Sequence, residues 1–197
     1  MTARKGKAMS GHGAHDSHGG NKRVALLISV LALLLAVSET LGKAAQTTTI
    51  GENIEAANYW SFFQAKTIRM TVTRTAAEEL ETLLPVTTDP EQKKRLEARI
   101  DRWQKTAARY DSEPETGEGR RELAEKAKAA QAKRDHAQAA YHHYEVGSAA
   151  FQIAIVLASA AIITGAMALV GVAGVLGLAG AAMTAIGFFI PEAVHLF

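Results

Sequence analysis

The residues of this chain with the clearest capacity for chemistry are its histidines, which form two groups. His12, His15 and His18 recur every third residue in a basic, glycine-rich segment, a pattern found in short metal-binding tracts. The alternative is a polar tail without fixed geometry, because a stable metal site needs three or four held ligands. His142 and His143 are adjacent, so on a helix they point about 100° apart and seldom hold one ion together. We therefore predict no metal site and no cofactor.

Motifs typical of enzymes are absent from the sequence. There is no nucleophile elbow, no phosphate-binding glycine loop and no His-Glu zinc motif. There is also no cysteine, which excludes thiol chemistry and disulfide bonds. Most acidic residues lie among basic ones, as on solvated helix faces. We predict that the protein is not an enzyme and has no catalytic residue.

Glu39 is the exception among the acidic residues, because it lies in an apolar segment. An ionisable group in a membrane helix is a candidate functional group. This interpretation predicts a small transporter or channel accessory subunit that uses Glu39 as a membrane carboxylate. The alternative is a carboxylate that reaches the membrane interface and pairs with Lys43 one turn later.

Apolar segments at two places in the chain must position these residues. The segment 24–42 is long enough for one membrane span. The segment 147–190 has no charged side chain and is about twice as long as one span requires. We predict that it forms two spans, with Gly165, Gly171 and Gly174 supplying the chain reversal.

The basic residues near the first apolar segment predict its orientation. Lys22 and Arg23 precede it, whereas Lys43 is the only basic residue directly after it. By the positive-inside rule the N-terminus is cytoplasmic and the region 43–146 lies across the membrane. The same features also resemble a signal peptide cleaved near Ser38, but the long basic region favours an uncleaved anchor.

The central region 43–146 is polar and has the features of a set of helices. Its basic and acidic residues are equal in number, which argues against nucleic acid as a partner. Leu84-Pro85 ends the first helix, and Asp89-Pro90 begins the next with an N-cap and a first-turn proline. The segment 111–119 is rich in Gly, Glu and Pro and predicts a loop at the far tip of the region.

Apolar stripes predict how these helices pack. The first helix has an eleven-residue repeat rich in small residues, whereas the other two have seven-residue spacing. The stripe of the third helix continues into the apolar segment as far as Phe151, which predicts one uninterrupted helix. The first stripe comprises Ile54, Ala57, Ser61, Ala65, Ile68, Val72 and Ala76; the second comprises Leu96, Ile100, Trp103, Ala107 and Tyr110; the third begins with Leu123, Ala127, Ala130, Arg134 and Ala137.

A cluster of aromatic residues is the leading candidate for a protein interface. Four aromatic residues within five positions cannot all face one partner helix, and Tyr and Trp are enriched at interfaces. The alternative is that they pack inside the bundle with their polar atoms hydrogen-bonded. The candidate interface comprises Tyr59, Trp60, Phe62, Phe63, Gln64 and Lys66.

Glycines at every third position of the last apolar segment predict close packing between transmembrane helices, because small residues let helix backbones approach. The residues concerned are Gly171, Gly174, Gly177 and Gly180.

The segment Asn53–Arg69 resembles a bacterial membrane family, domain-of-unknown-function family 4337. The most specific part of the resemblance is the aromatic cluster followed by Gln64, Ala65 and Lys66. The similarity covers most of the chain outside the His-rich tail. It implies a helical membrane protein of the bacterial envelope and implies no activity or catalytic residue.

These observations predict an all-α membrane protein. It has three transmembrane helices, one N-terminal and two in a C-terminal hairpin, and an extramembrane antiparallel helical bundle or coiled coil. The predicted parts are a disordered His-rich tail (1–23), the first transmembrane helix (24–42), the bundle (43–146), the transmembrane hairpin (147–190) and a short tail (191–197).

We expect a non-enzymatic interaction or scaffold protein of the bacterial inner membrane. Its expected partners are the lipid bilayer and either further copies of itself or another membrane protein. The N-terminus is expected in the cytoplasm and the bundle in the periplasm.

Overall fold

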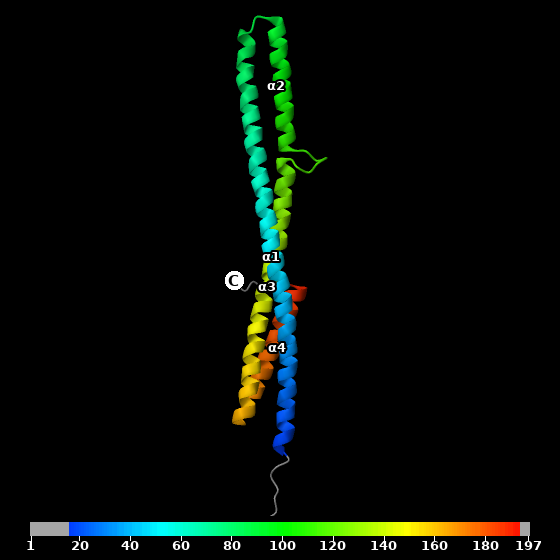
Figure 1. Ribbon diagram of the computed structural model, residues 1–197, viewed down its shortest axis with the longest axis vertical. Coiled ribbons are helices and arrows are strands. Elements are labelled where there is room, and N and C mark those ends of the chain that lie inside the picture. Colours follow the sequence, from blue (N-terminus) through cyan, green and yellow to red (C-terminus); the bar gives the residue numbers. More distant parts are fainter. Residues whose placement is uncertain (1–15, 194–197) are drawn as a thin grey trace, which may run out of the picture. The chain divides into compact units, whose positions relative to one another are not determined.

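The computed structural model describes residues 16–193, with side chains from residue 21 onward, and in this part of the chain it contains helices and no strand (Figure 1). The helices are α1 (Asp16–Leu83), the short 3-10 helix η1 (Leu84–Val86), α2 (Pro90–Asp111), α3 (Arg120–Thr164) and α4 (Met167–Phe189). The predicted all-α fold is confirmed.

Helix α1 begins at Asp16, within the segment 1–23 that was predicted to be a disordered tail. Residues 16–23 of that tail belong to α1, whereas His12 and His15 lie outside the described residues. An apolar helix extends readily into flanking polar residues, because adding one residue to an existing helix costs far less than starting a new one.

The contacts within the chain divide it into two compact units. We call Met1–Ala45 with Gln138–Phe197 the apolar unit, and Gln46–Ala137 the polar unit. Helices α1 and α3 each contribute residues to both units.

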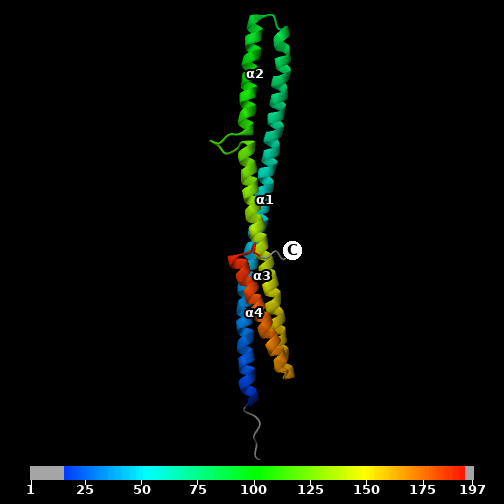
Figure 2. The same cartoon turned by 180° about the vertical axis from the view of Figure 1, so that it is seen from behind.

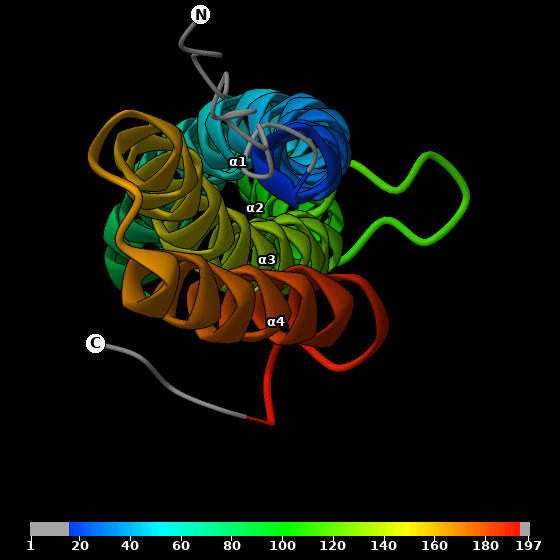
Figure 3. The same cartoon turned by 90° about the horizontal axis from the view of Figure 1, so that it is seen from below.

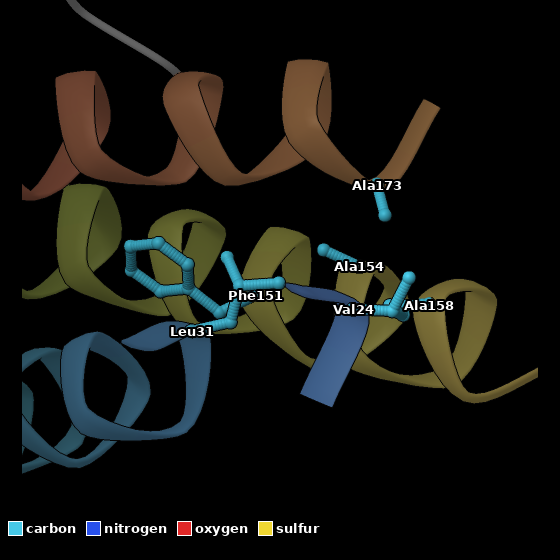
Figure 4. Packing of buried hydrophobic residues seen from close by; sticks show 6 residues of the cluster. All are labelled: Val24, Leu31, Phe151, Ala154, Ala158 and Ala173. Carbon is cyan, nitrogen blue, oxygen red and sulfur yellow. The ribbon is translucent and has the colours of Figure 1, made fainter. Parts of the chain in front are cut away.

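In the apolar unit, α1, α3 and α4 pack around one core (Figure 3). Leu31 and Ser38 of α1 meet Gly177 and Thr184 of α4, so these two helices run parallel. Helix α3 runs antiparallel to both. In the close view, Phe151 of α3 and Leu31 of α1 lie among small residues of the same core, which comprises Val24, Leu31, Phe151, Ala154, Ala158 and Ala173 (Figure 4).

Large and small side chains in the apolar unit are distributed opposite to the usual arrangement in a water-soluble protein. The residues that are fully buried in α3 and α4 include Ala154, Ala158 and Ala173. Large aliphatic side chains point outward instead, as for Ile163, which is 86% exposed, and Leu178, which is 75% exposed. By length and composition, the three helices of this unit are each able to cross a membrane.

The chain reverses between α3 and α4 at Gly165, where φ is +74° and the amide bonds to the carbonyl of Ala161 at 2.9 Å. Glycine adopts this left-handed conformation without steric cost. Of the three glycines expected to supply the turn, only Gly165 does so, because Gly171 and Gly174 lie inside α4.

The polar unit is an antiparallel pair in which one partner is interrupted. Residues of α1 face α2 at Glu81 and Gln104, whose side chains bond at 2.7 Å, and face α3 at Asn53 and Arg134, which bond at 3.3 Å. Helices α2 and α3 therefore follow one another along the same side of α1 (Figures 1 and 2). The predicted position of the 111–119 loop is wrong. The tip is the turn that contains η1, and the loop projects from the side of the pair.

The predicted stripes of α2 and α3 are confirmed. Ile100 and Ala107 are buried in α2, and Leu123, Ala127 and Ala130 are buried in α3. The predicted continuation of this helix into the apolar segment is confirmed as well, because α3 extends without a break from Arg120 past Phe151 to Thr164.

The prediction that the apolar stripe of α1 packs against α2 and α3 is wrong. Ile54, Ile68 and Val72 are 56%, 64% and 62% exposed. In the polar unit, the buried positions of α1 are instead Ala56, Met70 and Ala77, with Phe63 partly buried between the first two. These four residues are spaced by seven, which matches the seven-residue spacing of α2 and α3, whereas an eleven-residue repeat does not follow such a seam.

The predicted boundaries between α1 and α2 agree with the structure. Helix α1 ends at Leu83, two residues before Pro85. Asp89 is the N-cap of α2, and its Oδ1 accepts the amide hydrogen of Glu91 at 3.0 Å. Pro90 occupies the first helical position, where no amide donor is required.

Candidate functional site

The candidate site is a cavity of about 380 Å³ on the polar unit, between α1, the 112–119 loop and α3. We call it the aromatic pocket. Three of the six predicted interface residues line it, namely Tyr59, Phe62 and Lys66. The remaining lining residues are Ala65, Arg69, Gly117, Glu118, Leu123 and Lys126.

Helix α1 supplies one wall of the pocket through residues spaced by three and four. Tyr59, Phe62, Lys66 and Arg69 fall on one face of a helix with this spacing. The Tyr59 hydroxyl donates a hydrogen bond to Glu55 Oε1 at 2.8 Å, which directs the ring along α1. Phe62 is 61% exposed, so its ring is available to a partner.

The opposite wall depends on a loop with a defined internal structure. Ser112 Oγ donates to Glu122 Oε1 at 2.5 Å, and the Glu113 amide donates to Glu122 Oε2 at 3.2 Å. Gly117 has φ of +65°, and its carbonyl accepts a hydrogen bond from Lys126 Nζ at 2.8 Å. Gly119 is buried, and a β-carbon there would lie 2.7 Å from the Cα of Ser112, so only glycine fits.

Carboxylates that fasten the loop have lowered pKa values. Burial alone would raise the pKa of Asp111, but hydrogen bonds and charge from Arg120 and Arg121 bring it below its ordinary value of 3.8. A hydrogen bond from Arg109 lowers the pKa of Glu113. A hydrogen bond from Ser112 lowers the pKa of Glu122.

The electrostatic character of the aromatic pocket is basic. Lys66, Arg69 and Lys126 line it together with a single carboxylate, Glu118. The Lys66 side chain is only 16% exposed; its ammonium lies 3.8 Å from Glu118 and 5.6 Å from the centre of the Tyr110 ring. Apolar surface and excess positive charge together suit a partner with an apolar group and an anionic group.

The other predicted interface residues have different positions. Trp60 and Phe63 are partly buried and pack edge to face at 5.3 Å, and the guanidinium of Arg120 lies 5.7 Å from the centre of the Phe63 ring. Gln64 is exposed. The aromatic cluster is therefore divided: Tyr59 and Phe62 line the pocket, while Trp60 and Phe63 pack within the pair.

Several lining residues were not predicted from the sequence. Arg69 continues the helical spacing of Tyr59, Phe62 and Lys66, and this spacing was the available signal. Gly117 and Glu118 reach the pocket through the loop and Leu123 and Lys126 through α3, so their approach depends on tertiary structure.

Glu39 lies on the outer surface of the apolar unit. It is exposed, and its Oε1 accepts a hydrogen bond from Gln152 Nε2 at 3.2 Å. It therefore has a polar partner on α3, which matches a carboxylate held on the flank of a helix pair better than one enclosed in a transport cavity.

A buried polar junction, which was not predicted, lies deeper in the apolar unit. Ser38 is fully buried; its hydroxyl donates to the Tyr144 carbonyl at 3.0 Å and lies 3.1 Å from Thr184 Oγ1. A β-carbon at Gly147 would lie 2.7 Å from Thr184 Oγ1, so glycine permits this approach. Hydroxyls in an apolar environment join helices when they are hydrogen-bonded.

His143 is also buried, at 1% exposure. Its Nε2 lies 3.1 Å from the Pro191 carbonyl, and since a carbonyl only accepts, Nε2 carries the proton. Among residues 21–193, no group of three or more His, Cys, Asp or Glu is arranged to hold a metal ion.

The four predicted packing glycines differ from one another. A β-carbon at Gly177 would lie 2.6 Å from Leu31 Cδ2, and one at Gly180 would lie 3.0 Å from the Gly147 carbonyl oxygen. At Gly171 and Gly174 a β-carbon would meet nothing within 4 Å, so these two glycines do not form close contacts within the chain.

These features define a class of protein: an all-helical chain with three helices able to cross a membrane and a polar helical pair that carries a basic, aromatic pocket. The chain belongs to the family described as Domain of unknown function (DUF4337), whose family model matches residues 20–190. The resemblance seen in Asn53–Arg69 is thereby confirmed. No curated protein and no solved structure matches the chain.

Proposed function

We propose that this protein is a non-enzymatic, membrane-anchored interaction protein of the bacterial envelope. Its apolar unit would cross the inner membrane three times, and its polar unit would hold a partner in the aromatic pocket. The observation that carries the membrane part of the proposal is the outward orientation of the large aliphatic side chains. In water these side chains would be buried, whereas lipid removes that driving force and leaves small residues to pack the helices together.

The basic residues around the first span support an orientation for this arrangement. Lys22 and Arg23 precede it and only Lys43 follows closely. The N-terminus would then be cytoplasmic and the polar unit periplasmic.

Two measurements test the anchoring and the orientation. The protein should remain in the pellet when membranes are washed at alkaline pH, whereas release into the supernatant would contradict a membrane-spanning unit. Alkaline phosphatase inserted at Glu115, in the exposed loop, should be active, and green fluorescent protein at the same place should be dark. The reverse pattern would place the polar unit in the cytoplasm.

The partner-binding part of the proposal rests on the composition of the aromatic pocket. A photo-crosslinking amino acid at Phe62 should yield a defined adduct in intact cells, and the same amino acid at exposed Lys93 of α2 serves as the control. Arg69→Glu should reduce the Phe62 adduct, because it reverses one charge in the pocket without removing a hydrogen bond or ion pair that the Arg69 side chain makes within the chain. Equal adducts from Phe62 and Lys93, or no effect of Arg69→Glu, would contradict a role for the pocket.

A further inference from the structure

The exposed face of α1 in the polar unit carries a regular apolar stripe whose large side chains are exposed, and one of its small members, Ala65, also lines the edge of the aromatic pocket. We call it the α1 stripe. Its four large members are each more than half exposed, at 56% for Ile50 and Ile54, 64% for Ile68 and 62% for Val72. The small members between them are exposed as well. The complete stripe comprises Ile50, Ile54, Ala57, Ser61, Ala65, Ile68 and Val72.

The α1 stripe has the spacing of a helix-packing surface. Its members follow one another at intervals of three and four residues, within an eleven-residue repeat. Such a repeat keeps the stripe on one side of a nearly straight helix and favours contact with another helix that has the same repeat. Helices α2 and α3 instead have a seven-residue spacing and already contact the other side of α1.

The order of residue sizes is the same in both directions from Ser61. Alanines lie four residues away on each side, isoleucines lie seven residues away, and β-branched residues lie eleven residues away. The α1 stripe is therefore complementary to a copy of itself: large residues meet large ones at the ends, and small residues allow close approach in the centre.

The chemistry of the α1 stripe also favours burial. It contains no charged residue, whereas the exposed surface of α2 includes consecutive Lys93, Lys94 and Arg95. Its one polar member, Ser61, already donates its hydroxyl hydrogen to the Ala57 carbonyl at 2.9 Å. Burying Ser61 would therefore leave no donor without a partner.

We infer that the α1 stripe binds the same stripe of a second copy of this chain, with the two α1 helices parallel and in register. The stripe alone fits either direction. The parallel direction rests on the proposed function, because copies inserted by the same three spans have the same orientation in one bilayer. In that arrangement each stripe residue meets its own counterpart across a two-fold axis.

The size of the contact predicts where the dimer forms. From Ile50 to Val72 the stripe is about 33 Å long and about 10 Å wide on a helix, a footprint of roughly 330 Å². Stable dimers in solution bury about 800 Å² per partner. The α1 stripe is therefore too small to hold two free molecules strongly, whereas anchoring in one membrane raises the effective concentration of the second stripe. The test must use the full chain in native membranes.

Disulfide cross-linking tests this inference cleanly, because the natural chain contains no cysteine. Ser61→Cys should give a covalent dimer on mild oxidation of membranes. Thr71→Cys, which is also exposed on α1 but lies outside the stripe, is the matched control and should give about tenfold less. Equal yields from the two variants, or no dimer from Ser61→Cys, would overturn the inference.

The direction of the two helices is tested by two further variants. Ala57→Cys should cross-link to itself when the helices are parallel. Cross-linking that appears only when Ala57→Cys and Ala65→Cys chains are mixed would mean that they are antiparallel and would overturn the proposed arrangement. Adding Ile54→Arg to the Ser61→Cys chain should lower the dimer yield about tenfold, because it brings like charges together at the contact.

An alkaline wash of the same membranes separates this inference from the proposed function. A chain that stays in the pellet but does not cross-link at Ser61 contradicts only the dimer. A chain released by the wash contradicts the membrane anchoring, and with it the reason for a parallel dimer, whatever the cross-linking yield.

Discussion

At the scale of single residues, glycines of α4 have two separate roles. Gly177 and Gly180 allow α4 to approach α1 and α3, whereas Gly171 has open space where a side chain would be. Regular spacing along a helix does not distinguish these roles, because only one side of α4 contacts the other two helices. The structure thus separates glycines that were equivalent in the sequence.

This difference gives a prediction with a matched control. Gly180→Leu should destabilise the apolar unit by about 1–3 kcal/mol, because its β-carbon would press against the backbone of Gly147 and the ring of Phe151. Gly171→Leu, on the same helix, should leave stability nearly unchanged. Thermal unfolding of the purified full chain in detergent measures both; equal midpoints for the two variants would argue against the packing described for Gly180.

The carboxylates that fasten the 112–119 loop give a prediction about pH. Folding lowers the pKa of Asp111, Glu113 and Glu122, so the stability that they contribute is present above their unfolded values, near 3.8 for Asp111 and 4.5 for the glutamates. That stability is lost as pH falls through the lowered values of the folded protein. The loop should therefore open on acidification below about pH 4, before the helices unfold.

Hydrogen exchange measures this opening directly. Protection of the Glu113 amide, corrected for the intrinsic effect of pH on exchange, should fall as the pH is lowered below about 4. Asp111→Asn should have lower protection at pH 5 and a smaller further loss. Protection that is independent of pH in the natural protein would show that these carboxylates do not hold the loop closed.

At the scale of helices, α2 begins at a well-formed N-cap whose contribution can be measured. Replacing Asp89 with Ala removes the acceptor for the Glu91 amide and should cost about 1 kcal/mol. Thr88→Ala, one residue earlier and exposed, is the control. The expected result is faster hydrogen exchange in the first turn of α2 for Asp89→Ala alone. Equal exchange in both variants would contradict a stabilising role for the Asp89 cap.

The helices also show which features a sequence can predict. The Asp89 cap and the stripes of α2 and α3 follow from local chemistry and from one dominant spacing, and both were predictable. Helix α1 carries two apolar spacings at once, one through Ala56 and Met70 and one through Ile54 and Ile68. Only the second of these surfaces was identified from the sequence, because periodicity alone does not say which surface contacts α2 and α3; that choice depends on the spacing of the partner helices.

The same reasoning applies to the aromatic pocket. Tyr59 and Phe62 stood out in the sequence because four aromatic residues lie within five positions, and Lys66 follows them in the same segment. Leu123 and Lys126 belong to the same cavity only because α3 lies antiparallel to α1. The part of the pocket wall that the loop forms could not be predicted from the sequence for a further reason. Gly119 and Glu122 shape the loop through close contacts with the backbone of residues 112–113, which sequence patterns do not show.

At the scale of the whole molecule, the two units use opposite rules of composition. In the polar unit, buried alanines and partly buried aromatic rings form a narrow contact, and the exterior is largely charged and polar outside the α1 stripe. In the apolar unit, alanine, glycine and hydrogen-bonded hydroxyls pack in the interior around a few larger side chains such as Leu31 and Phe151, and much of the exterior is aliphatic. Each unit thus has an exterior suited to a different solvent, which is why overall composition alone resembled that of an ordinary globular protein.

The aliphatic exterior of the apolar unit has a consequence for the timing of biosynthesis. If the three apolar helices were completed in water, Ile163, Leu178 and their outward neighbours would form an exposed hydrophobic surface that is prone to aggregation. Chaperones or neighbouring nascent chains would compete for that surface. If the apolar unit spans a membrane as proposed, its helices would have to reach the insertion machinery during translation, and a delay in targeting should produce aggregates instead of a soluble pool.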